Sequence, residues 1–156
     1  MEGYKIDKDA LYSKNHIWIK KVKDNLFRIG ISDLVQRYLS KIEHINTLPI
    51  GSKVRKGEAI GEIEALKTVV DIISPVTGCI VSVNEEIMDN PKLINQDPHR
   101  WILEIRAYHE EEIEGLMSPQ QYLDALAKHE IDIFTASFLH KFSSKYVEKK
   151  LKKRSR

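Results

Sequence analysis

Residues 57–78 read GEAIGEIEALKTVVDIISPVTG, and this segment contains the clearest strand and turn pattern of the sequence. Ala59–Glu64 alternates with a period of two, and Val69–Ile73 is rich in β-branched residues, so both runs predict strands. These runs flank Glu64–Thr68, which is long enough only for a tight connection. We therefore expect a β-hairpin that presents Lys67 near its tip, in solvent.

The chain on both sides of this hairpin shows the same short, strand-like runs, separated by turns that contain Gly, Pro or Asn. The runs that predict strands are His16–Ile19, Leu26–Ile31, Ile42–Leu48, Cys79–Asn84 and Trp101–Ile105, with turns expected over Gly51–Gly57 and Ser74–Gly78. Ser32 can cap a short helix over Asp33–Leu39. The pattern predicts a mainly β (α+β) fold, a small antiparallel β-sandwich or flattened barrel with a short internal helix and C-terminal helices.

The last fifty residues differ in character, and we expect a boundary between residues 1–107 and a helical extension over 108–156. Ser118 and Pro119 predict the start of a helix, with Tyr122, Leu123 and Leu126 on one apolar side. Four aromatic residues then recur at four-residue spacing and predict a second helix, which would pack on the body or weakly pair two copies: Phe134, Phe138, Phe142 and Tyr146.

Charge is distributed unevenly along a chain whose formal net charge is +2. Residues 141–156 hold eight basic residues against one glutamate, a net +7, which leaves −5 for residues 1–140. No aromatic residue is interleaved with the basic residues after Tyr146, so we expect a solvated end and no nucleic-acid partner. No run approaches the length of a membrane span, and residues 1–5 do not resemble a targeting signal, so we expect a cytoplasmic protein without a membrane partner.

Three classes of chemistry find little support in the residues. The single cysteine, Cys79, excludes an intramolecular disulfide and is expected to be a small packed residue. The six histidines lack the spacing of a zinc site, so we expect no metal. No pattern brings titratable groups together, so we expect no catalytic residue and no enzyme activity. Lys67 itself is suited to being acylated, because an exposed protonated amine is a poor nucleophile and a poor base.

The hairpin and its surroundings resemble the glycine cleavage system H protein family. The family pattern E-S-V-K-A, followed by a strand and S-P-V-S-G-x-V-x-x-V-N, is matched by Glu64, Lys67, Ser74, Pro75, Val76, Gly78, Val81, Val83 and Asn84. Further matches keep the family's order and spacing over about residues 11–107: His16, Trp18, Gly30, Ile31, Ser32, Gln36, Leu48, Pro49, Gly51, Val54, Lys56, Gly57, Pro91, Leu93, Ile94, Asn95, Asp97, Pro98 and Trp101.

The resemblance implies a lipoyl carrier of the barrel-sandwich hybrid type. It implies lipoate attached covalently to Lys67, with Glu64 recognised by the lipoylating enzyme. Biotin carriers usually read M-K-M at this place, whereas Leu66 and Thr68 flank the lysine here, which favours lipoate. The implied role is to shuttle a lipoyl-bound aminomethyl group between glycine decarboxylase, aminomethyltransferase and dihydrolipoyl dehydrogenase.

Three departures from the family pattern leave an alternative open. Ile17 replaces the Glu of H-E-W, Ser40-Lys41 replaces the usual Gly-Asp, and residues 97–101 are about two residues shorter and lack two glycines. The alternative is an H-like lipoate-binding protein of another pathway, either sulfur oxidation with heterodisulfide-reductase-like complexes or lipoyl relay.

Overall fold

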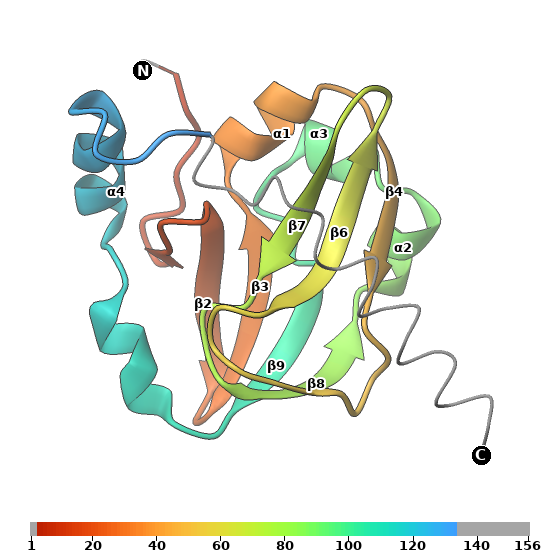
Figure 1. Cartoon of the computed structure of the whole chain (residues 1–156), viewed down its shortest axis with the longest axis vertical. Coiled ribbons are helices and arrows are strands. Elements are labelled where there is room, and N and C mark those ends of the chain that lie inside the picture. The colour runs from red at the N-terminus through yellow and green to blue at the C-terminus, as the bar shows by residue number, and fades with distance from the viewer. Residues whose placement is uncertain (1–2, 134–156) are drawn as a thin grey trace.

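The computed structural model describes residues 3–133, which form two antiparallel sheets with short helices at their edges (Figure 1). In this part of the chain one sheet has six strands in the order β1 (Leu11–Tyr12), β2 (Ile17–Lys23), β3 (Leu26–Ile31), β9 (Leu103–Ala107), β8 (Gly78–Val83) and β5 (Lys53–Val54). The other sheet has three strands in the order β4 (Ile42–Thr47), β6 (Ala59–Ala65) and β7 (Val69–Ile73).

One apolar core lies between the two sheets. Ile29 and Ile105 from the large sheet and Ile63 and Ile72 from the small sheet are fully buried in it. Burial of side chains of this size contributes about 1.5–3 kcal/mol each, so the core holds the sheets together. The predicted mainly β antiparallel sandwich is confirmed, with two open sheets instead of a closed barrel.

Several local predictions match the structure closely, and others need correction. Helix α1 covers Asp33–Leu39 and β3 covers Leu26–Ile31, as expected. His16 was expected at the start of a strand, but it precedes β2, is buried, and has a φ of 66°. The last strand begins at Leu103 instead of Trp101, and the expected turn after Gly51 contains the short strand β5.

Helices α2 (Glu85–Asp89) and α3 (Leu93–Gln96) are absent from the sequence-based prediction. At five and four residues they are too short to show an apolar period, and each buries a single isoleucine, Ile87 and Ile94.

The segment after β9 returns along the N-terminal edge of the large sheet. A 3₁₀ helix over Glu110–Gly115 leads to a bridge between Met117 and Tyr12. Helix α4 (Pro119–Ala127) then begins at Ser118, whose hydroxyl accepts the backbone N–H of Gln121 while the Gln121 side chain accepts the N–H of Ser118. The predicted start of this helix is confirmed. The predicted aromatic helix and the basic tail lie outside the described residues.

A buried polar chain joins α4 to the body of the protein. His16 Nδ1 lies 2.7 Å from the hydroxyl of Tyr122, which lies 2.9 Å from the hydroxyl of Ser32. His16 Nε2 is hydrogen-bonded to the carbonyl of Asp132. Burial lowers the pKa of His16 and raises the pKa of Tyr122. The expected boundary at residue 107 stays a prediction.

Candidate attachment site on the β6–β7 hairpin

Strands β6 and β7 form the predicted hairpin, whose tip stands at one end of the small sheet (Figure 1). The backbone N–H of Ala65 donates to the carbonyl of Thr68 at 2.9 Å and closes a two-residue loop of Leu66 and Lys67. Below the loop, Glu64 pairs with Val69 and Ile63 with Val70. Ile63 and Val70 are buried in the core, so the base of the hairpin is fixed while its tip is free.

The side chains at the tip point away from the protein. Leu66 is 76% exposed, the largest exposed fraction among the large apolar side chains of residues 3–133, and Lys67 is also exposed. Within residues 3–133, the Lys67 amine has no hydrogen bond or ion pair. An enzyme can therefore reach this amine without breaking an existing contact.

Glu64 lies on β6 three residues before Lys67, half-buried on the outer face of the small sheet. Asn46 Nδ2 donates to Glu64 Oε1 at 3.3 Å from the neighbouring strand β4. Burial raises the pKa of Glu64, and the hydrogen bond and repulsion from Glu62 raise it further. His44, opposite Glu64 on β4, opposes this shift. The structure thus places the two predicted residues, Glu64 and Lys67, on one hairpin.

Two further carboxylates lie on the same outer face and were not singled out from the sequence. Glu62 pairs with Asp71 across β6 and β7, and the two residues are only 6% and 3% exposed. Their alternation with apolar neighbours is typical of a strand with a solvated outer face, so the sequence carries no signal of their burial.

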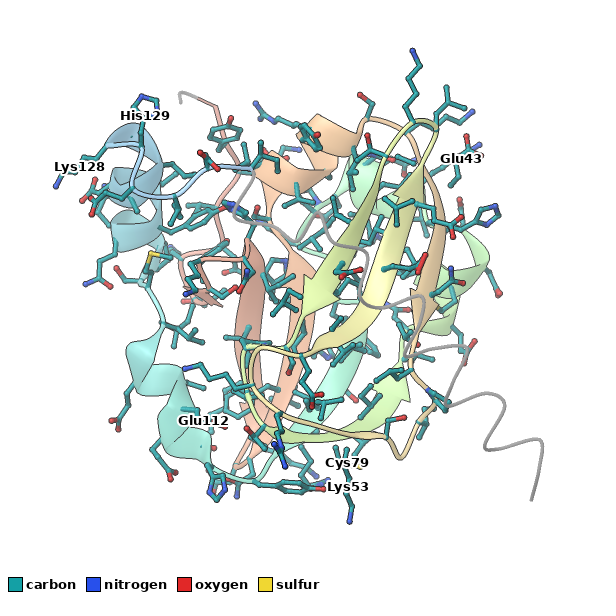
Figure 2. The ribbon with its side chains drawn as sticks, viewed as in Figure 1. Glu43, Lys53, Cys79, Glu112, Lys128 and His129 are labelled. Carbon is teal, nitrogen blue, oxygen red and sulfur yellow. The ribbon has the colours of Figure 1, made fainter. Side chains whose placement is uncertain are left out.

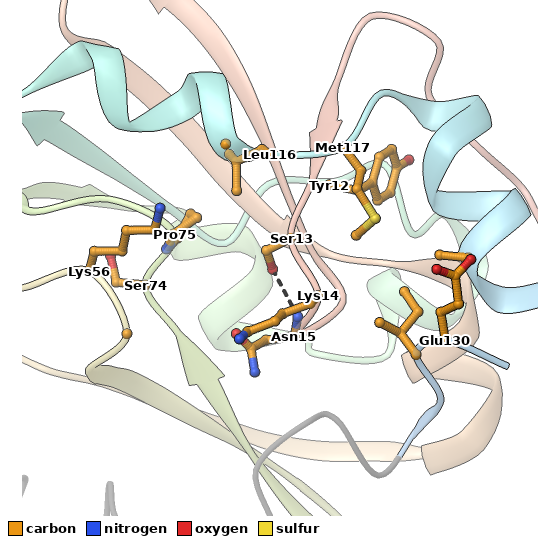
Figure 3. Close-up of a pocket in the computed structure, with 14 residues that line it drawn as sticks. Tyr12, Ser13, Lys14, Asn15, Lys56, Ser74, Pro75, Leu116, Met117 and Glu130 are labelled. Carbon is orange, nitrogen blue, oxygen red and sulfur yellow. Dashed lines mark hydrogen bonds between the residues drawn. The ribbon is translucent and has the colours of Figure 1, made fainter.

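Figure 3 shows a cavity of about 630 Å³ lined by Ser74 and Pro75. These two residues follow β7, so the cavity lies at the opposite end of this strand from Lys67. Ser74 and Pro75 form one wall, and Leu116 and Met117 form another. Ser74 lies seven positions after Lys67, which corresponds to about 20 Å along an extended strand. The cavity is therefore separate from the hairpin tip.

Cys79 is half-buried in β8, at the end of the molecule opposite Glu43 (Figure 2). In residues 3–133, no three His, Cys, Asp or Glu side chains are grouped so that they could hold a metal ion. None of the helices in this region has the length and apolarity needed to cross a membrane.

The structure defines the class of this protein: a small antiparallel β-sandwich domain with Lys67 at the tip of a hairpin. A family model described as glycine cleavage H-protein matches residues 10–129. The chain therefore belongs to the glycine cleavage H-protein family.

Curated relatives and a solved structure agree with this assignment. The chain is 40% identical over 119 residues to the glycine cleavage system H protein of Listeria monocytogenes, covering 75% of this chain and 94% of the relative. It is 36% identical over 125 residues to the "Probable glycine cleavage system H protein" of Pyrococcus abyssi, covering 79% and 93%. The crystal structure of a glycine cleavage system H protein from Mycobacterium marinum superposes with a TM-score of 0.70 at 29% identity, covering 78% of this chain and 100% of that one.

Members of this family are carrier proteins that hold lipoate covalently on a lysine. The hairpin fits this group, because it offers an exposed amine with no hydrogen-bond or ion-pair partner among residues 3–133, next to an exposed apolar side chain, Leu66.

Proposed function

We propose that this protein is the lipoyl carrier of a glycine cleavage system and that Lys67 is its attachment residue. The observation that carries the proposal is the exposed Lys67 amine at the tip of a hairpin whose base is buried. Glu64, three residues earlier on the same hairpin, is the carboxylate that marks the site for the lipoylating enzyme. The similarity to proteins named for the glycine cleavage system favours this pathway, and the alternative lipoyl-dependent pathways are not favoured.

The role of the chain in this function is to hold Lys67 in an exposed position. Ile63, Val70 and Ile72 anchor the hairpin, so Lys67 stays at a fixed distance from the body. When bound, lipoate supplies a dithiol that carries the aminomethyl group and undergoes the redox chemistry. A tether anchored at one point converts the encounters between separate enzymes into local ones, which raises the effective concentration of the carried group.

The partners of this carrier are glycine decarboxylase, aminomethyltransferase, dihydrolipoyl dehydrogenase and the enzyme that attaches lipoate. The chain itself supplies no catalytic residue. Each partner must approach the end of the small sheet where Lys67 projects, so this end is the surface on which they dock in turn.

Reconstitution with the three partner enzymes from the same cell tests this function. We expect glycine-dependent formation of NADH to require the lipoylated chain and to be lost in Lys67→Arg. Lys53→Arg is the matched control, because Lys53 is an exposed lysine on β5 at the far end of the molecule (Figure 2). Full activity of Lys67→Arg, or no activity with the lipoylated wild-type chain, would overturn the proposal.

A further inference from the structure

A second hollow, of about 360 Å³, opens beside the Lys67 hairpin. It lies between the end of α1, the start of β4 and helix α3. Ile42 at the start of β4 pairs with Ala65 at the end of β6, so Lys41 lies next to the loop that holds Lys67. Figure 1 shows α1 and α3 at the same end of the molecule as the hairpin tip.

Among residues 3–133, the charged residues that line this hollow are all cationic: Arg37, Lys41 and Lys92. Arg37 is partly neutralised by Asp33, whose carboxylate lies 2.9 Å from the guanidinium. Lys41 and Lys92 are exposed, and neither has an ion pair with another residue in the 3–133 range. Gathering like charges costs free energy unless an anion offsets it, so this arrangement favours a negatively charged partner.

A hydrogen-bond network holds the walls of the hollow in place. Asn95 Oδ1 accepts the backbone N–H of Ile42 at 3.0 Å, and Asn95 Nδ2 donates to Gln36 Oε1 at 3.0 Å and to the carbonyl of Ser40. Asn95 thus ties α3 to both α1 and β4. The backbone atoms that carry the three cations are therefore pre-positioned, which lowers the entropy lost when a partner binds.

The lining chemistry indicates what kind of group binds. The hollow is near the lower limit for a ligand pocket, and the other residues that line it are uncharged polar side chains: Gln36, Ser40, Asn95 and Gln96. Such a site suits carboxylate side chains presented by another protein better than a buried small molecule. Lys41 stands where the family pattern has Asp, so the positive charge distinguishes this chain.

We propose that Arg37, Lys41 and Lys92 dock acidic side chains of the lipoylating enzyme while it works on Lys67. This inference rests on one part of the proposed function, which is that Lys67 is lipoylated. The enzyme that attaches lipoate must reach this end of the protein whichever pathway the carrier serves. Complementary charges at the rim of an interface raise the association rate and make it sensitive to salt.

Lipoylation kinetics of the full chain test the proposal, with lipoate, ATP and the lipoate–protein ligase of the same cell. We expect the double variant Lys41→Asp/Lys92→Glu to raise the KM for the carrier about tenfold with kcat unchanged. Raising the salt concentration should increase the KM of the wild-type chain and have little effect on the double variant. Thermal unfolding establishes that the variant is folded.

The matched control carries the same change of charge at the far end of the molecule, Lys53→Asp/Lys23→Glu. A KM for Lys41→Asp/Lys92→Glu equal to that of wild type, or an equal rise in the control, overturns the inference. Failure of the proposed function has a different signature, because the wild-type chain then acquires no lipoyl group on Lys67.

Discussion

At the scale of single residues, Glu64 is the second predicted site residue, and its environment leaves it accessible to a partner. Its carboxylate is half-buried and receives one hydrogen bond from Asn46. Glu64→Gln keeps the shape and the acceptor for Asn46 but removes the charge. We expect the kcat/KM for lipoylation to fall about tenfold, since a charge-assisted hydrogen bond contributes about 1.5–3 kcal/mol. The exposed neighbour Glu43 on β4 provides the control Glu43→Gln, and equal rates for both variants would contradict a marking role for Glu64.

Ser40 has an unusual backbone conformation for a residue with a side chain. Its φ is 59° and its ψ is −121°, at the end of α1 where the family pattern has Gly. Strain of this kind costs about 1–3 kcal/mol, whereas a glycine adds only about 0.5–1 kcal/mol of unfolded-state entropy. We expect Ser40→Gly to raise the free energy of unfolding by about 1 kcal/mol in urea denaturation. A lower urea midpoint for Ser40→Gly than for the wild-type chain would show that Ser40 is not strained.

At the scale of elements, α4 depends on its N-terminal cap. Ser118 and Gln121 satisfy each other's backbone N–H groups, and Pro119 begins the helix. Ser118→Ala should lower the free energy of unfolding by about 1 kcal/mol and increase hydrogen exchange over residues 118–127. The hairpin should keep its protection, because α4 and Lys67 lie in separate parts of the molecule. Unchanged hydrogen exchange over α4 in Ser118→Ala would show that the Ser118 cap does not stabilise this helix.

The helices and strands differ in how well local sequence patterns predict them. The β6–β7 hairpin and β3 follow from local alternation and β-branched residues. Helix α1 begins after Ser32 as predicted, but the Ser32 hydroxyl makes no capping hydrogen bond and instead accepts one from the Tyr122 hydroxyl. Helix α3 does not follow from a local pattern, because Asn95 holds it in place through contacts with residues more than fifty positions away. Helix α2 is not predicted either, because its five residues are too few to show an apolar period. Lys67 and Glu64 could be assigned because their signal is local, whereas the Arg37–Lys41–Lys92 hollow depends on α3.

At the scale of the whole molecule, His16 links β2, α1 and α4 through Tyr122, Ser32 and Asp132. Burial lowers its pKa below the ordinary value of 6.5, so the unfolded chain binds a proton more readily than the folded chain. This contribution to stability is complete above pH 6.5 and is lost as the pH falls from 6.5 to the folded pKa.

We therefore expect the free energy of unfolding to decrease between pH 6.5 and 5, by at most about 1.4 kcal/mol per pH unit from this residue. Subtracting the pH profile of His16→Gln isolates the contribution of His16 from those of the other histidines. Parallel profiles for the two proteins would show that His16 is not protonated more readily in the unfolded chain.

Attachment of a lipoyl group to Lys67 can be tested by peptide mass spectrometry of the protein isolated from its native cell. We expect a lipoyl modification on the peptide that contains Lys67 and on no other lysine. An unmodified Lys67 in cells whose other lipoyl proteins are fully modified, or a lipoyl group on a different lysine, would contradict it.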